Sequence, residues 1–386
     1  MGALRIPRYP TRERTSPAEL RGLALGGLAR RMAEPSRCRS LAPDAYLRRL
    51  GHELECVERM QVADYFLIVA DLTRHARSID IEVGPGRLTA PSSILNWALG
   101  ITDVDSLRHG LVFERFLNPE RVVVPRIEID LGAADHSALL ERAAEVFGPS
   151  RVADVVADGD EGDPASGARM CSLAIGDVPL DATLTPGARK VPAITAREAA
   201  RAGLLTIDCV CRSAPRDVVD DELRRALEVV APTTFDELVA AIALGREAPR
   251  ELGLLDAYSE RARFGGRSRP MAPLAECVLE PTHGVLVYEE QTIGIAQHVG
   301  GYTAGGADLF RRALGKKDPH EVGRGRSAFL AGAKANGVSE AEAERVFDYT
   351  EALAGYAFSK SHAVGVATSL CRALNPLVGA LRTPDD

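Results

Sequence analysis

The residues best suited to chemistry are acidic ones that alternate with aliphatic ones in "VVVPRIEIDLG", residues 122–132. This period of two predicts a β-strand with one buried face. Arg126, Glu128 and Asp130 lie together on one face of that strand. Carboxylates aligned in this way hold positive charge, commonly a divalent ion. A guanidinium cannot ligate Mg²⁺, and as a fixed cation it repels divalent ions. The segment predicts a metal site or an internal salt cluster, and Arg126 favours the cluster.

Two further segments could contact phosphate. The loop "VGPGRLTAPSS", residues 83–93, is rich in glycine and hydroxyl side chains and carries Arg87, Ser92 and Ser93. Such a loop lets backbone N–H groups approach a phosphate, although it could equally serve only to start a helix at Ile94. The segment "LFRRALGKKDP" sets four cations within two helical turns, which could meet phosphates or form a solvated face; they are Arg311, Arg312, Lys316 and Lys317.

Hydrophobic periodicity predicts the elements that position these residues. Helices are expected over 16–31, 44–60, 65–77 and 136–148, and helical patterns dominate from 217 onward. The stretch "AGLLTIDCVC" predicts a second strand, centred on Asp208. Between the two strands, an acidic connector rich in Gly and Pro is expected from about residue 150 to 187.

Composition limits the class of protein. The chain has 386 residues, 46% of them hydrophobic, which suffices for two or three compact units. Its net charge of −7 gives no global attraction to nucleic acid, so a polyanion site must be a local basic patch. Seven cysteines without ligand spacing favour a reducing cytoplasm over a zinc site or a disulfide framework. Neither an apolar run near the ~20 residues of a membrane span nor a signal-peptide core is found, so no membrane association is expected.

Several motifs together resemble one family. The stretch from "YFLIVADL" to "RIEIDL", residues 65–131, is similar to the palm of the C-family replicative polymerase, the bacterial DNA polymerase III alpha subunit. Residues 284–322 and "GYAFSKSHAVGVA", residues 355–367, are similar to the fingers of the same family. The likeness extends over nearly the whole chain and is weakest at about 135–195.

The resemblance implies an α/β fold, namely a polymerase-β-like nucleotidyltransferase palm with a reduced thumb and mostly helical fingers. The implied domains are palm at 1–132, a reduced thumb or connector at 133–195, the closing palm strand at 196–212 and truncated fingers at 213–386. The family's clamp-binding part is expected to be absent.

The resemblance also implies DNA-templated DNA synthesis with Mg²⁺, a primer–template and deoxynucleoside triphosphates. Acidic residues of the family hold two metal ions there, and the positions that correspond to them carry Glu128, Asp130 and Asp208. Arg126 stands at the first ligand position, so metal binding by Glu128 and Asp208 is in doubt and the activity is expected to be impaired. The implied phosphate contacts are Arg87, Ser92, Ser93, Arg311, Arg312, Lys316, Lys317, Lys360 and His362.

Three hypotheses follow for the activity of this chain. It is a DNA polymerase, a non-catalytic paralogue of the polymerase core that binds DNA or a partner, or a degenerate remnant. Primer extension with Mg²⁺ and Mn²⁺ separates the first hypothesis from the other two.

Overall fold

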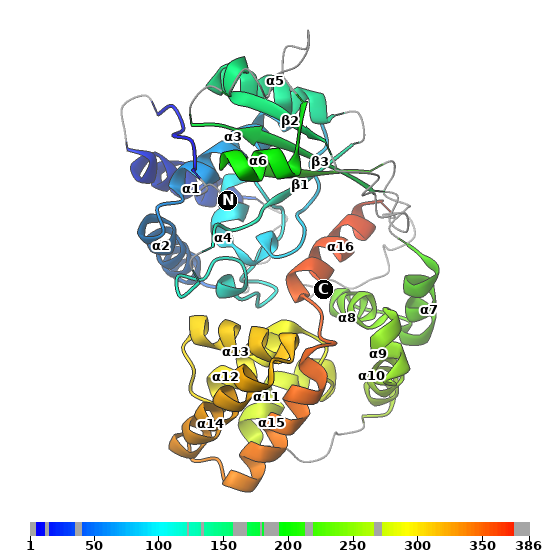
Figure 1. Ribbon diagram of the computed structural model, residues 1–386. Coiled ribbons are helices and arrows are strands. Elements are labelled where there is room, and N and C mark those ends of the chain that lie inside the picture. The colour runs from blue at the N-terminus through cyan, green and yellow to red at the C-terminus, as the bar shows by residue number, and fades with distance from the viewer. Residues whose placement is uncertain are drawn as a thin grey trace. The chain divides into compact units, whose positions relative to one another are not determined.

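The structure is a computed structural model, shown in Figure 1. It describes residues 5–11, 15–34, 41–121, 123–132, 135–156, 168–177, 180, 193–212, 219–265 and 272–373. The chain divides into two compact units. Unit 1 comprises residues 1–110 and 124–218, and unit 2 comprises 111–123 and 219–386.

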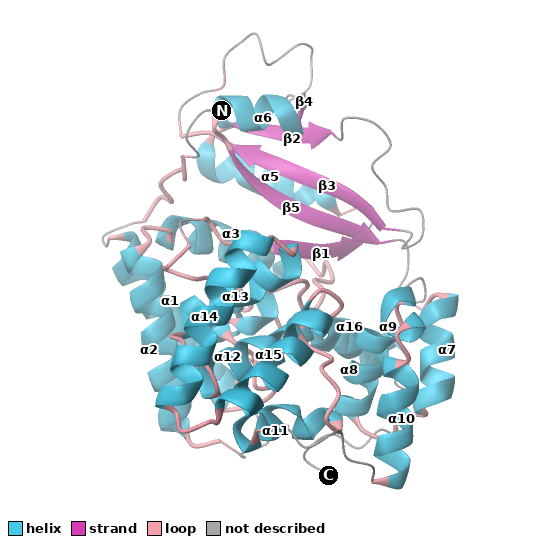
Figure 2. Cartoon of the chain, turned by 60° about the horizontal axis from the view of Figure 1, so that its bottom comes forward, coloured by secondary structure: helices cyan, strands magenta, loops and turns pink. Residues whose placement is uncertain are grey.

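Unit 1 combines a small mixed sheet with helices, and the α/β class predicted from the sequence is confirmed. The strands are β1 (Glu128–Gly132), β2 (Val152–Val156), β3 (Ala168–Ile175), β4 (Ala193–Thr195) and β5 (Leu205–Arg212). They lie in the order β1-β5-β3-β2-β4, as Figure 2 shows. The β1–β5 and β2–β4 pairs are parallel, whereas β5–β3 and β3–β2 are antiparallel.

In the described part of unit 1, six α-helices accompany this sheet. They are α1 (Ser16–Met32), α2 (Pro43–Arg59), α3 (Ala63–Ser78), α4 (Ile94–Leu99), α5 (His136–Phe147) and α6 (Ala196–Ala202). Four of them match the ranges expected from hydrophobic periodicity. The first three turns of α3 are buried on nearly all sides, whereas its last residues are partly exposed.

The first strand is shorter than the sequence pattern predicts. It begins at Glu128, and residues 123–127 belong to no helix or strand. Pro125 has no N–H to donate to a ladder, and the backbone N–H of Ile127 donates to the Tyr65 hydroxyl at 2.9 Å. Arg126 therefore precedes the strand, where its side chain can turn toward β5.

The stretch expected as a connector contains strands. Both β2 and β3 lie within it, and their apolar residues Ala153, Val155 and Ala174 are buried with Ile194 of β4. The strands were not recognised in the sequence because neither VADVV nor ARMCSLAI alternates polar and apolar residues regularly. Residues 157–167, 178–179 and 181–187 of this stretch lie outside the described residues.

In its described part, unit 2 is built from helices joined by loops, with one isolated β-bridge between Tyr288 and Phe358. Its α-helices are α7 (Asp221–Val230), α8 (Phe235–Leu244), α9 (Glu247–Glu251), α10 (Leu254–Phe264), α11 (Pro273–Leu279), α12 (Glu289–His298), α13 (Ala304–Lys316), α14 (Pro319–Ala335), α15 (Glu340–Ala354) and α16 (Lys360–Ala373). A buried aromatic cluster of Phe310, Phe329 and Phe347 joins α13, α14 and α15. No described helix of either unit is long and apolar enough to cross a bilayer.

Candidate functional site

Carboxylates from two parallel neighbouring strands meet in unit 1. The β1–β5 register pairs Glu128 with Asp208, so both side chains stand on the same face of the sheet. Glu128 and Asp130 are buried. On the other side of β5, Ser172 of β3 is paired with Asp208 and donates its hydroxyl to the Asp208 Oδ1 at 2.7 Å. Sequence reasoning missed Ser172, because strand β3 itself was missed.

Arg126 occupies the space between these acids. Its Nε lies 2.6 Å from the Asp208 Oδ2 and 3.5 Å from the Glu128 Oε1. The ion pairs that the sequence predicted for Arg126 are therefore confirmed. The Arg126 guanidinium makes both ion pairs although its side chain is 62% exposed.

A second arginine, Arg87, reaches Glu128 and also Asp130 from the loop at residues 83–93, which we call the glycine loop. The Arg87 Nε lies 3.8 Å from the Glu128 Oε2, and its Nη1 lies 3.4 Å from the Asp130 Oδ1. The loop is held against β1 at Gly84, whose N–H donates to the Asp130 carbonyl oxygen at 3.1 Å. A Cβ at Gly84 would lie 2.5 Å from the Asp130 Cβ, so only glycine allows this approach.

Arg87, Arg126, Glu128, Asp130 and Asp208 form what we call the salt cluster. Burial raises the pKa of Glu128, and the nearby Arg126 and Arg87 offset only part of that effect. Burial opposes the charge of Arg126, but Asp208 and Glu128 outweigh it and raise the Arg126 pKa. Arg126 and Glu128 therefore each stabilise the charged form of the other.

The salt cluster does not fit a pair of Mg²⁺ ions. Mg²⁺ requires oxygen ligands in near-octahedral geometry, whereas the oxygens that would supply them face two guanidinium groups. Within the described ranges, no group of three or more His, Cys, Asp or Glu residues is arranged to hold a metal ion. The arrangement satisfies the carboxylates with side-chain cations instead.

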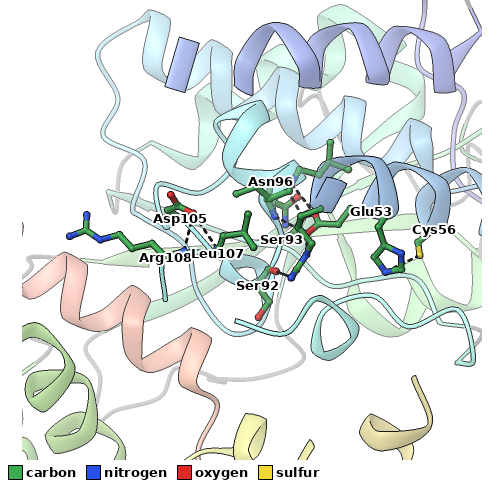
Figure 3. Close-up of polar contacts among 12 residues, drawn as sticks. Glu53, Cys56, Ser92, Ser93, Asn96, Asp105, Leu107 and Arg108 are labelled. Atoms are coloured by element: carbon green, nitrogen blue, oxygen red, sulfur yellow. Dashed lines mark hydrogen bonds and ion pairs between the residues drawn. The ribbon is translucent and has the colours of Figure 1, made fainter. Parts of the chain in front are cut away.

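The two serines of the glycine loop are buried. Ser93 caps α4 by accepting from the Asn96 N–H at 3.1 Å, and its hydroxyl donates to the Glu53 Oε2 at 2.7 Å (Figure 3). The backbone N–H groups of Ile94 and Leu95 also donate to the Glu53 carboxylate. This internal carboxylate takes the place at the helix start that a phosphate would need.

In unit 2, Arg311 is also turned inward. Its Nη1 lies 2.9 Å from the Glu289 Oε1 and its Nη2 lies 3.2 Å from the Asp308 Oδ1. Arg115, from the 3₁₀ turn Phe113–Arg115, donates from its Nε to the other Glu289 oxygen at 2.7 Å. Burial lowers the pKa of Arg311 despite the nearby Glu289.

Arg121 adds a further cation beside α13. Its segment docks on the helix start, where the Asn118 Nδ2 donates to the Gly305 carbonyl oxygen and the Thr303 hydroxyl donates to Glu120. Burial lowers the Arg121 pKa, and the positive charge of Arg312 lowers it further. Arg115, Arg121, Arg311 and Arg312 form what we call the arginine group; Arg115 and Arg121 were not singled out in the sequence, although "FERFLNPER" contains both.

The remaining predicted phosphate contacts differ in exposure. Lys316 and Lys317 are exposed, and the Lys317 Nζ lies 4.9 Å from the centre of the Tyr356 ring. Lys360 begins α16, where its backbone N–H donates to the buried Glu290 at 2.8 Å and its Nζ lies over the Tyr288 ring. His362 packs edge to face against Phe358. Phosphate contact by these residues stays a prediction.

Comparison with known proteins identifies the family. Residues 18–166 match the family model of the bacterial DNA polymerase III alpha NTPase domain, and residues 220–337 match that of the alpha subunit finger domain. Together the two matches cover more than half of the chain. The chain belongs to the family of bacterial DNA polymerase III alpha subunits.

Curated relatives agree with this assignment. The DNA polymerase III subunit alpha of Haemophilus influenzae is 27% identical over 95% of this chain, and that of Escherichia coli K12 is equally similar. The corresponding protein of Neisseria meningitidis serogroup A is 28% identical over 94% of the chain. In each case the match spans 42% of the relative, so the chain corresponds to less than half of those proteins.

Proposed function

We propose that this chain is a DNA polymerase III alpha-type core that binds DNA and nucleotide phosphates but extends a primer at no more than background rate. The observation that carries the proposal is the 2.6 Å contact between the Arg126 Nε and the Asp208 Oδ2. A two-metal nucleotidyl transfer needs unpaired carboxylates to hold both ions. Here these oxygens are neutralised by Arg126 and Arg87.

On this proposal, the family domains keep their positions without the metal chemistry. Residues 1–132 and 196–212 form the palm, 133–195 form a reduced thumb or connector, and 213–386 form truncated fingers. Glu128, Asp130 and Asp208 stand at the catalytic positions, whereas Mg²⁺ does not fit between them. The primer–template and deoxynucleoside triphosphates would be held by exposed cations of unit 2.

The arginine group supports phosphate binding in unit 2. Glu289 and Asp308 neutralise Arg311 and Arg115, which leaves the charges of Arg121 and Arg312 less compensated. Burial is the main cause of the lowered Arg121 pKa, and the charge of Arg312 lowers it further, because neighbouring guanidiniums repel one another. An anionic ligand would relieve this repulsion.

Primer extension with Mg²⁺ or Mn²⁺ tests the catalytic part of the proposal. Loss of a metal-ligating carboxylate removes several kcal/mol of transition-state stabilisation, a rate loss of roughly a thousandfold or more. We expect incorporation no higher than in a no-enzyme control, and the same low value for Asp208→Asn. Templated incorporation above the control that Asp208→Asn abolishes would contradict the proposal.

The second candidate function is DNA synthesis itself. It is favoured by the curated relatives, all of them named as DNA polymerase III subunit alpha, and by the acids retained at β1 and β5. The same primer-extension experiment decides between the two candidates, because only this one predicts incorporation that depends on Asp208.

A further inference from the structure

Two cysteines stand directly opposite each other in the sheet of unit 1. The antiparallel β3–β5 register makes Cys171 the partner of Cys209. Residues opposite one another in an antiparallel pair share a face, with Cα atoms about 4.5–5.5 Å apart. That spacing falls within the roughly 4.4–6.8 Å found between the Cα atoms of disulfide-bonded cysteines. Both residues carry reduced thiols in this structure.

The cysteine pair is separate from the salt cluster. Ser172 and Asp208 are the next pair in the register, and successive residues of a strand point to opposite faces. The two thiols therefore lie on the face of the sheet opposite the Ser172–Asp208 hydrogen bond. A covalent link between them would fix the strand that carries Asp208 without consuming any group of the salt cluster.

The pair also differs from the other cysteines that the structure describes. Cys56 of α2 is buried, Cys277 of α11 is exposed, and Cys371 belongs to α16. In the β3–β5 register, the Cα partner of Cys211 is Arg169. Cys171 is only partly buried, whereas Cys209 is fully buried, so an oxidant dissolved in water reaches Cys171 first.

We propose that Cys171 and Cys209 form a reversible cross-strand disulfide with a low-molecular-weight disulfide as oxidant. The Cys171 thiolate attacks one sulfur of the oxidant, which gives a mixed disulfide and releases one thiol. The Cys209 sulfur then attacks the Cys171 sulfur and displaces the second thiol. Two protein thiols are oxidised, the oxidant is reduced to two thiols, and the two protons end on those products.

Oxidised glutathione on the full chain provides the test. After incubation, remaining thiols are alkylated, the protein is digested without reductant, and linked peptides are identified by mass spectrometry. We expect a Cys171–Cys209 linked peptide and a melting temperature several degrees above that of the reduced chain, both reversed by dithiothreitol.

Three variants serve as controls. Cys277→Ser should form the link as the wild type does. Cys209→Ser should stop at the mixed disulfide on Cys171, and Cys171→Ser, at the partly exposed position, should show no link and no oxidant-dependent melting shift. The proposal is overturned if both cysteines remain alkylatable while Cys277 is glutathionylated, or if Cys171 links to Cys211 instead.

Discussion

Arg87 and Arg126 both pair with Glu128 but differ in their contact with water. The Arg87 side chain is 19% exposed and the Arg126 side chain 62%. Water screens an exposed ion pair, whereas removal of one partner of a buried pair leaves an uncompensated charge. Arg126 makes the shorter contact, but its removal should lower the free energy of unfolding less than removal of Arg87.

This difference gives a prediction for matched substitutions. Arg87→Gln should lower the free energy of unfolding by about 2–4 kcal/mol, because Glu128 and Asp130 would stay buried with less counter-charge. Arg126→Gln should lower it by about 1 kcal/mol or less. Urea denaturation of both variants measures the two values. Equal losses, or a larger loss for Arg126→Gln, would show that exposure does not decide the strength of these pairs.

The sequence allowed the pairing of Arg126 to be predicted, but not that of Arg87. A cation two residues from Glu128 on an alternating segment must lie near that carboxylate, so local pattern was sufficient. Arg87 is 43 residues from Asp130 and meets it only because the glycine loop packs on β1. The contacts of Ser172, Arg115 and Glu289 could not be predicted for the same reason, because their partners are distant in the sequence and meet only in the folded chain.

At the scale of elements, a buried carboxyl joins α12 to α16. The backbone N–H groups of Lys360 and Ser361 donate to Glu290 at 2.8 and 3.3 Å. Burial raises the pKa of Glu290 above its usual 4.5, and the bond from Lys360 offsets this only in part. The folded chain therefore binds the Glu290 proton more tightly than the unfolded chain does.

The raised pKa of Glu290 predicts how stability depends on pH. The stability contribution of Glu290 is fully present below about pH 4.5 and is lost as the pH rises through the raised pKa of the folded state. The melting temperature of the wild type, measured relative to Glu290→Gln, should therefore fall as the pH increases above 4.5 and then become constant.

Glu342→Gln is the control, because the contribution of Glu342 to stability should change with pH in the opposite direction. The Ser339 hydroxyl and backbone N–H lower the Glu342 pKa, so this carboxylate stabilises the fold above its unfolded-state pKa and less as the pH falls. Relative to Glu342→Gln, the wild type should gain stability with rising pH. If the melting temperature of the wild type relative to Glu290→Gln also rose with pH, the pKa of Glu290 would not be raised by folding.

Elements with a regular hydrophobic pattern were predictable from the sequence, and elements without one were not. Helices α1, α2, α3 and α5 lie within one or two residues of their expected ranges, because each repeats its apolar pattern over several turns. Strand β5 was also expected. Strands β2 and β3 were missed because neither their pattern nor any turn signal distinguished them from an irregular segment, and Pro125 shortened β1.

At the scale of the whole molecule, the net charge of −7 opposes binding to a polyanion. Any DNA affinity must come from local cations such as Arg312 and Lys316, which lie one turn apart on α13. Attraction of this kind weakens steeply with salt, because it depends on the release of counterions from the phosphates.

The double variant Arg312→Ala/Lys316→Ala tests this local attraction. If both side chains neutralise phosphates of a primer–template, the slope of log K against log salt should become about two units shallower. The matched control is Lys334→Ala/Arg345→Ala, which removes two exposed charges from α14 and α15. An identical slope change in both double variants would indicate a general charge effect and no phosphate site on α13.

The central claim is that Arg126 occupies the position of the metal ions, and melting in the presence of Mn²⁺ tests it most directly. A ligand stabilises the folded state by RT ln(1 + [L]/Kd), so a weak site gives almost no shift. We predict an unchanged wild-type melting temperature at millimolar Mn²⁺. Arg126→Asp should melt lower without metal, since acids would face acids, and its melting temperature should rise with Mn²⁺ concentration. A wild type that gains several degrees with Mn²⁺, or an Arg126→Asp variant that gains none, would contradict the account.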